Sequence, residues 1–216
     1  MTPEHLLQRL RETLPRACLL ATPLPRVPEI RLYLFDPESM QGPLSHDEAQ
    51  RVVAEPAYWS FCWASGQVLA RDLLDHPERV RGKVVVDVGP GSGVVAIAAA
   101  LAGAKQVLAC DIDPLALEAV RANAVLNGVA LDVIDQLPEG KVDVLTAADI
   151  LYDRENLPLL ARFREVARDV WLADSRIRSL QAEGYRLVST GEAVTCPDLN
   201  EFEEFNVVRV YHAPGV

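Results

Sequence analysis

Apolar and polar residues follow two different patterns on either side of residue 80. Downstream of it, short apolar runs alternate with longer segments of helical periodicity, which is typical of an α/β protein with a parallel sheet. The run Val84–Val86 contains only β-branched residues, as in a strand that is covered on both faces. The pattern predicts strands over 84–86, 106–110, 131–134, 142–147 and 170–173, and helices over 94–102, 114–126 and 157–168.

The last two predicted strands, Tyr185–Val194 and Phe205–His212, have no helical segment between them. A direct connection of this kind predicts an antiparallel pair. We therefore expect a Rossmann-like α/β fold with a seven-stranded sheet. The sheet is mostly parallel with an antiparallel strand near its C-terminal edge, and helices lie on both faces.

The first 80 residues predict an N-terminal extension of helices and a strand. An amphipathic helix is expected over 1–16, before the prolines of 22–28, and a strand over 30–35. Ser45 and Glu48 have the spacing of a capping box, which predicts a helix from there through residue 54. One or two further helices are expected over 56–75. Trp59 and Trp63 are four residues apart, so a helix would place both on one face.

The composition indicates one folded domain. The chain has 216 residues, of which 50% are hydrophobic and 24% are charged, and these proportions exclude a disordered protein. With 21 Lys and Arg against 31 Asp and Glu, the net charge is −10, which argues against a nucleic-acid partner. Acidity favours cationic partners, but it also keeps a protein in solution, and the sequence leaves both interpretations open.

The cysteines and the apolar runs exclude further classes. Four cysteines are widely spaced without a nearby histidine pair, so we expect neither a metal site nor a disulfide framework. The longest apolar run, Val94–Ala104, is too short to cross a bilayer, and residues 1–16 carry charges throughout, unlike a signal peptide. We expect a cytoplasmic protein without a membrane partner, and the sequence leaves the oligomeric state open.

A glycine-rich segment, Asp87-Val88-Gly89-Pro90-Gly91-Ser92-Gly93, lies between a predicted strand and a predicted helix. Glycines there let a ligand approach the backbone, and the helix offers free N–H groups to an anion. Alone, the segment is also compatible with a tight turn. Asp111 ends the next strand, 22 residues after Gly89, where its carboxylate can accept hydrogen bonds from a ribose. We expect Asp113 to cap the helix that Pro114 begins.

The spacing of the glycines distinguishes between nucleoside ligands. A dinucleotide fingerprint requires a third glycine at the position of Val94. Asp87, two residues before the first glycine, would repel a pyrophosphate but suits a ligand with a cationic amine. S-adenosylmethionine carries an ammonium group, a sulfonium, a ribose and one carboxylate. The residues therefore favour S-adenosylmethionine, with a nicotinamide cofactor as the alternative.

The glycine segment and Asp111 resemble motif I and the acidic end of the second strand in the class I, or seven-β-strand, S-adenosylmethionine-dependent methyltransferases. Two further segments, Trp59–Gln67 and Asp149-Ile150-Leu151-Tyr152-Asp153, resemble the W-x-x-G and D-x-x-Y motifs of the branch that contains the electron-transfer-flavoprotein β-subunit lysine methyltransferase and its bacterial relatives. The resemblance covers roughly residues 28–160. After the fifth predicted strand, Ala173-Asp174-Ser175-Arg176 departs from the G-D-P-G-R-like segment of that branch.

The resemblance implies an enzyme in which residues 81–216 form the S-adenosylmethionine-binding core and residues 1–80 form an extension that covers substrate and cofactor, within one structural domain. The predicted cofactor-binding residues are Trp63, Asp87, Gly89, Gly91, Gly93, Asp111, Ile112 and Asp135. Trp63 would stack near the cofactor or wall the lysine channel, and Asp135 would meet the adenine amino group.

The residues after the fourth predicted strand indicate the acceptor. Enzymes that methylate planar amide or ring nitrogens typically carry N-P-P-Y or D-P-P-Y there, whereas this chain has Asp149-Ile150-Leu151-Tyr152 without the proline pair. The difference favours an aliphatic amine and hence a protein partner with an accessible lysine. We expect Asp149 and Tyr152 to bind and orient that amine, although Asp149 can instead contact the methionine part of the cofactor.

Other interpretations stay open. The acceptor can be a small amine or a ribosomal-protein side chain, and the chain can be a Rossmann protein that binds a nicotinamide cofactor or a binding module without catalytic activity. The acidic run of Glu201, Glu203 and Glu204 is either a surface for a lysine-rich substrate or a solvated loop.

Overall fold

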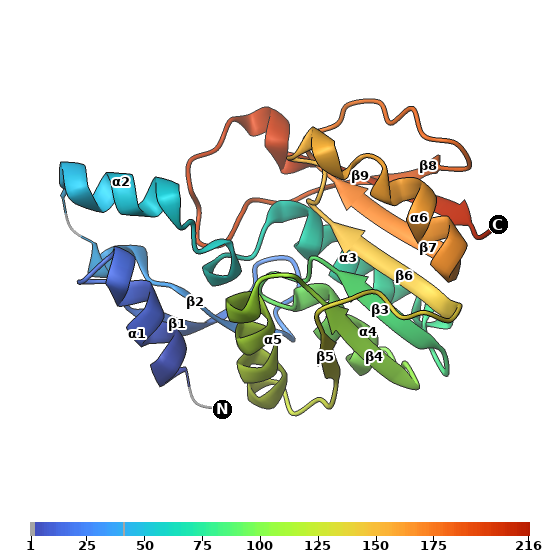
Figure 1. Cartoon of the computed structure of the whole chain (residues 1–216), viewed down its shortest axis with the longest axis horizontal. Coiled ribbons are helices and arrows are strands. Elements are labelled where there is room, and N and C mark those ends of the chain that lie inside the picture. Colours follow the sequence, from blue (N-terminus) through green and yellow to red (C-terminus); the bar gives the residue numbers. More distant parts are fainter. Residues whose placement is uncertain (1–2, 41) are drawn as a thin grey trace.

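The computed structural model describes residues 3–40 and 42–216, and its centre is a seven-stranded sheet in the order β5-β4-β3-β6-β7-β9-β8 (Figure 1). The strands are β3 (Val84–Val88), β4 (Gln106–Cys110), β5 (Asp132–Ile134), β6 (Val142–Ala148), β7 (Ala167–Asp174), β8 (Arg186–Glu192) and β9 (Val207–Pro214). The five strands from β3 through β7 are all parallel to one another, whereas β9 is antiparallel to both of its neighbours, β7 and β8. The predicted sheet is confirmed.

The register of the central strands brings three loops to one edge of the sheet. Val88, the last residue of β3, pairs with Cys110 at the end of β4 and with Ala147 near the end of β6. The segments that follow these strands therefore leave the sheet side by side. The chain order also reverses between β3 and β6, and the edge beside such a reversal is where open α/β sheets bind their ligands.

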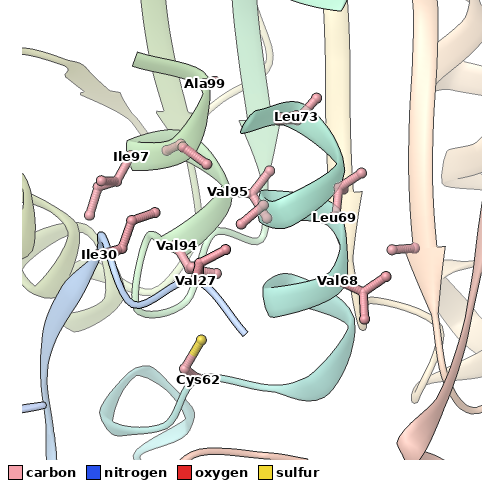
Figure 2. Packing of buried hydrophobic residues seen from close by; sticks show 14 of the residues in the cluster. Val27, Ile30, Cys62, Val68, Leu69, Leu73, Val94, Val95, Ile97 and Ala99 are labelled. Carbon is pink, nitrogen blue, oxygen red and sulfur yellow. The ribbon is translucent and has the colours of Figure 1, made fainter. Parts of the chain in front are cut away.

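Helices cover both faces of the sheet, as predicted. The helices of the core are α3 (Ala64–Asp75), α4 (Val94–Leu101), α5 (Pro114–Leu126) and α6 (Leu159–Val166). Neighbouring residues of a strand point to opposite faces, so Val85 packs in the cluster with α3, α4 and α5, and Val86 packs in the cluster with α6. Figure 2 shows α3 and α4 side by side in the first cluster, with Val95 between them.

The N-terminal extension packs against α5. It contains α1 (Glu4–Thr13), β1 (Leu19–Pro23), β2 (Arg31–Phe35) and α2 (His46–Ala54). Leu6 and Leu10 of α1 share a buried cluster with Ala116 and Ala119 of α5. The capping box at the start of α2 is confirmed, with Ser45 and Glu48 bonding each other's backbone N–H.

Strand β1 corrects the predicted N-terminal helix. The helix ends at Thr13 rather than running to residue 16, and Leu19–Pro23 forms a two-stranded antiparallel sheet with β2. Residues 1 and 2 of the predicted helix lie outside the described residues. Burial along β1 does not alternate, so the period of two that identifies a strand in a sequence is absent. The pairing with β2 decides its conformation.

The segment before α3 also differs from the prediction. Tyr58–Ser60 forms a 3-10 turn, and the chain is extended at Cys62, whose backbone exchanges hydrogen bonds with Cys196 at 2.7 and 2.8 Å. This bridge to a distant segment prevents one continuous helix over 56–75. Trp59 and Trp63 therefore do not share a helix face, because Trp59 is buried against α1 and α5 while Trp63 precedes α3.

Several predicted boundaries in the C-terminal half are shifted, including those of the last two strands, which span 186–192 and 207–214 rather than 185–194 and 205–212. Helix α6 spans Leu159–Val166, and β7 begins at Ala167 rather than at residue 170. Pairing with β6 from Ala167 onward extends the strand into the segment that the sequence predicts as helix. Within the described residues, no helix has the length and apolar character to cross a membrane.

Candidate functional site

The loop between β3 and α4 depends on its three glycines. Gly89, Gly91 and Gly93 have φ angles of 63°, 52° and 89°, a region that residues with a side chain rarely adopt. A Cβ atom on Gly93 would also lie 3.2 Å from Val120 Cγ2 of α5. The spacing of the glycines in the sequence is thus a requirement of the backbone path.

A pocket lies between this loop and the beginning of α3. Five predicted site residues line it: Trp63, Asp87, Gly89, Gly91 and Asp149. It is also lined by residues that were not predicted, namely Gly66, Pro90, Ser92, Val94, Val95 and Ala148.

The other five predicted residues are outside that lining. Gly93 ends the glycine loop, and Asp111, Ile112, Asp135 and Tyr152 lie in the segments after β4, β5 and β6. Ile112 follows β4 and is 93% exposed, and Asp135 follows β5 and is exposed. Tyr152 lies in the loop after β6, where its ring contacts that of Tyr58. The fold therefore gathers these residues around one opening, although it does not place them in one closed cavity.

Asp87 is a buried carboxylate with one unsatisfied oxygen. Thr146 Oγ1 donates to its Oδ1 at 2.7 Å, whereas Oδ2 is buried and has no hydrogen-bond partner among the described residues. Burial raises the pKa of Asp87 to about 7, and the hydrogen bond from Thr146 and the nearby backbone N–H of Ala96 oppose this rise. Buried polar atoms normally have a partner, so the free oxygen suits a cationic group bound in the pocket.

Asp111 and Asp113, which follow β4, have different roles. The Oδ1 atom of Asp111 accepts a hydrogen bond from the Asp113 backbone N–H at 3.0 Å, and partial burial raises the pKa of Asp111. Asp113 caps α5, because its Oδ1 accepts from Leu115 N at 2.8 Å and Pro114 occupies the first helical position. The predicted cap is confirmed, and Asp111 is the carboxylate beside the glycine loop.

The carboxylate of Asp149 is engaged by the protein itself. It accepts hydrogen bonds from Ser65 N at 2.9 Å, Ser65 Oγ at 2.5 Å and Ser175 Oγ at 3.1 Å. Burial raises the pKa of Asp149 to about 6, against the hydrogen bonds from Ser65. The side chain therefore ties the end of β6 to the first turn of α3, and its contact with an acceptor amine stays a prediction.

Ser65 and Gly66 are site residues that sequence reasoning missed. A Cβ atom on Gly66 would lie 2.8 Å from Val94 Cγ1, so the close approach of α3 to α4 requires glycine there. The small residues that follow Trp63, Ala64-Ser65-Gly66, were the available signal. They are visible in the W-x-x-G motif, but only the tryptophan entered the prediction.

A row of aromatic rings borders the pocket. This aromatic row consists of Phe35, Phe61, Trp63, Tyr58 and Tyr152, whose successive ring centroids are 5.8, 5.9, 5.9 and 5.7 Å apart. Burial raises the pKa of Tyr152, and the nearby Tyr58, Asp153 and Asp111 add to the rise. The hydroxyl of Tyr152 is therefore neutral at physiological pH.

The acidic run near the C-terminus is largely neutralised by its neighbours. Glu201 forms an ion pair with Arg176 and accepts a hydrogen bond from Thr195 Oγ1 at 2.6 Å, and Glu204 pairs with Arg178. These contacts weaken the interpretation of the run as a free surface for lysine-rich substrates. Within residues 3–40 and 42–216, no cluster of His, Cys, Asp or Glu could hold a metal ion.

Comparisons with known sequences agree with the motifs. The model of the ribosomal protein L11 methyltransferase family (PrmA) matches residues 69–157. The electron transfer flavoprotein β-subunit lysine methyltransferase of Mus musculus is 40% identical over 133 residues, which are 59% of this chain and 51% of that protein. The protein of the same name from Xenopus laevis is 39% identical over 163 residues, 71% of this chain and 65% of its own length. The chain thus spans about half to two thirds of these curated relatives.

Solved structures share the fold. The ribosomal protein L11 methylase of Lactobacillus delbrueckii subsp. bulgaricus superimposes with a TM-score of 0.54 and 26% identity, covering 70% of this chain and 79% of that one. Magnesium protoporphyrin IX methyltransferase from Synechocystis PCC 6803, crystallised with S-adenosylmethionine, gives a TM-score of 0.54 at 19% identity over 82% of this chain and 87% of that one. In sequence and in fold, the chain therefore resembles the class I, seven-β-strand S-adenosylmethionine-dependent methyltransferases, and within them the lysine methyltransferases of the electron transfer flavoprotein β-subunit.

Proposed function

We propose that this protein is an S-adenosylmethionine-dependent methyltransferase that N-methylates a lysine side chain of another protein. The observation that carries the proposal is the buried Oδ2 atom of Asp87, which has no hydrogen-bond partner in the part of the chain that the structure describes and lies in a pocket lined by the glycine loop. A carboxylate oxygen at that place fits an ammonium group and does not fit a pyrophosphate. The sequence relatives named as lysine methyltransferases support the same assignment.

The residues present fit the cofactor. Asp87 would hold the ammonium group, Asp111 the ribose hydroxyls, and the glycine loop allows a close approach to the backbone. When bound, S-adenosylmethionine supplies a methyl group on a positively charged sulfur, which an amine lone pair can displace.

The chain then has to deliver a neutral amine in line with that methyl group. Such positioning contributes at most about 7–11 kcal/mol to lowering the barrier. Tyr152 has a raised pKa and Asp149 already accepts three hydrogen bonds, so neither is a free general base at the pocket. The lysine therefore loses its proton to water, and desolvation together with the adjacent positive charge lowers the pKa of the lysine.

A lysine acceptor is favoured by the segment after β6. Asp149-Ile150-Leu151-Tyr152 lacks the proline pair that is typical of enzymes that methylate planar nitrogens. In addition, the net charge of −10 favours a cationic partner. A side chain of a ribosomal protein is the second candidate, because the matching family model is that of the ribosomal protein L11 methyltransferase. A cytoplasmic location and the absence of nucleic-acid and membrane partners stay predictions.

Calorimetry with S-adenosylhomocysteine tests the cofactor. Asp111→Ala should weaken binding by more than about a hundredfold, since each of two hydrogen bonds to a charged group contributes about 1.5–3 kcal/mol net. Asp47→Ala, an exposed aspartate in α2, is the matched control and should bind like the wild type. Absence of binding to the wild type, or unchanged affinity in Asp111→Ala, would contradict the cofactor assignment.

The acceptor is tested separately with labelled cofactor. Cell extract is incubated with the protein and methyl-labelled S-adenosylmethionine, and the labelled product is hydrolysed to amino acids. Methylated lysine is the expected product. Label that ribonuclease releases, or label recovered in another amino acid, would refute the lysine acceptor while leaving the cofactor assignment standing.

A further inference from the structure

Three rings of the aromatic row, those of Tyr58, Trp63 and Tyr152, form a cluster that is joined to the pocket through Trp63. The centroid of Tyr58 is 5.9 Å from that of Trp63 and 5.7 Å from that of Tyr152, and Trp63 itself lines the pocket. They come from two distant parts of the chain, the segment before α3 and the loop after β6. The fold thus builds an aromatic surface next to the predicted cofactor.

Two of these rings are open to solvent. Tyr58 is 47% exposed and Tyr152 is 61% exposed, so the cluster is not a part of the core. The rings are nevertheless held in place, since Trp63 Nε1 donates a hydrogen bond to the Tyr58 carbonyl oxygen at 3.2 Å. Exposed apolar surface that is gathered in one place is typical of a binding site.

Asp149, the pocket carboxylate that the sequence assigns to the acceptor amine, is already hydrogen-bonded by the protein. Both oxygens of Asp149 are hydrogen-bonded to Ser65 or Ser175, and a cationic amine would have to displace those bonds. The faces of aromatic rings attract an ammonium group without requiring a free hydrogen-bond acceptor. The carboxylate of Asp111, which lies close enough to affect Tyr152, adds negative potential.

We propose that Tyr58, together with Trp63 and Tyr152, forms the surface that binds the alkylammonium group of the acceptor lysine through cation–π contacts. The inference rests on the proposed function and deepens it. Tyr58 becomes a substrate-binding residue, and Asp149 becomes a positioning residue that holds the first turn of α3. The aliphatic part of the lysine packs along the same rings.

Fluorine NMR of protein labelled with 3-fluorotyrosine tests the surface without relying on activity. The chain has five tyrosines, whose resonances are assigned from single Tyr→Phe variants. The protein, saturated with S-adenosylhomocysteine, is titrated with n-butylammonium chloride and, separately, with the neutral isostere 1-butanol. We expect the ammonium to shift the resonances of Tyr58 and Tyr152, whereas the buried Tyr185 and Tyr211 stay unchanged.

Substitutions at Tyr58 separate the ring from the rest of the surface. The dissociation constant for n-butylammonium is measured from the shift of the Tyr152 resonance. In Tyr58→Leu this constant should rise about two- to fivefold, because one exposed cation–π contact contributes that much. Tyr58→Phe keeps the ring and should restore the wild-type constant. Phe202→Leu changes an aromatic residue that is 76% exposed outside the aromatic row, and it should have no effect.

The outcomes distinguish this inference from the proposed function. If the wild type fails to bind S-adenosylhomocysteine, the proposed function is wrong. If S-adenosylhomocysteine binds, two results overturn the cation–π surface alone: equal shifts with 1-butanol and n-butylammonium, or an unchanged dissociation constant in Tyr58→Leu.

Discussion

Ser65 and Asp149 are 84 residues apart in the chain, yet the carboxylate of Asp149 accepts hydrogen bonds from both the backbone N–H and the hydroxyl of Ser65, at 2.9 and 2.5 Å. The first residue of this pair lies in the first turn of α3, where N–H groups have no partner within the helix. Asp149 follows β6 and has a φ of 52°, which is a strained conformation for a residue other than glycine. The contact joins the two sides of the pocket.

Loss of this link should destabilise the protein. Ser65→Ala removes a buried hydroxyl that donates to an ionised carboxylate, and we expect a loss of about 1–3 kcal/mol in the free energy of unfolding. Urea titration at pH 7.5, where Asp149 is ionised because its pKa is about 6, measures the effect. Ser179→Ala, at an exposed serine, is the control. Equal stability of the two variants would show that the link contributes nothing.

Cofactor affinity should depend on pH through Asp87. The pKa of this carboxyl is about 7 in the free protein, so it is mostly protonated at pH 6 and mostly ionised at pH 8. An ammonium group binds the ionised form, and protonation therefore competes with binding as the pH falls. We expect the affinity for S-adenosylhomocysteine to rise about tenfold from pH 6 to pH 8 and then to level off.

The matched variant for this prediction is Asp87→Asn, which cannot ionise. Its affinity should be low and nearly constant over the same range when followed by calorimetry. A wild-type affinity that does not change between pH 6 and pH 8 would rule out Asp87 as the partner of the ammonium group.

The contact of α3 with α4 should not tolerate a methyl group at Gly66. Alanine there would place its Cβ 2.8 Å from Val94 Cγ1, and overpacking of this kind costs about 1–3 kcal/mol. Gly140→Ala adds the same methyl group in open space and is the control. Thermal unfolding measures both variants, and adding Val94→Ala to Gly66→Ala should recover part of the loss. No recovery would mean that another contact is responsible.

The hydroxyl of Tyr152 should matter for transfer and not for cofactor binding. Tyr152→Phe keeps the ring but removes the group that can accept a hydrogen bond from, or donate one to, the acceptor amine. We expect kcat to fall about tenfold, as for the loss of one hydrogen bond near 1.4 kcal/mol. Affinity for S-adenosylhomocysteine should stay within twofold of the wild type. Full activity in this variant would show that the Tyr152 hydroxyl has no role in transfer.

The extent to which the sequence predicts this protein is clearest at the glycine loop and at α5. Gly89 and Gly93 adopt positive φ angles that their sequence spacing already indicates, and Asp113 with Pro114 begins α5 as expected. In both places the conformation follows from neighbouring residues of the chain. Backbone sterics, helix capping and the period of apolar positions are local effects, and a single sequence contains them.

The segment around Cys62 shows where local patterns fail. Its residues are compatible with a helix, but hydrogen bonds with Cys196 hold the chain extended there, and this turns Trp63 toward the pocket. Strand β1 exists for the same reason, because it pairs with β2. The residues in and around these two segments do not indicate that Cys196 and β2 will be their hydrogen-bonding partners.

The sequence by itself determined the sheet, the glycine loop and the carboxylates Asp87 and Asp111, since each depends on short-range order along the chain. The tertiary structure alone decided that Asp149 turns to Ser65 and that Tyr58 meets Tyr152. These contacts join residues far apart in the chain, and their energy comes from burial and hydrogen bonding that exist only once the sheet has brought the loops together.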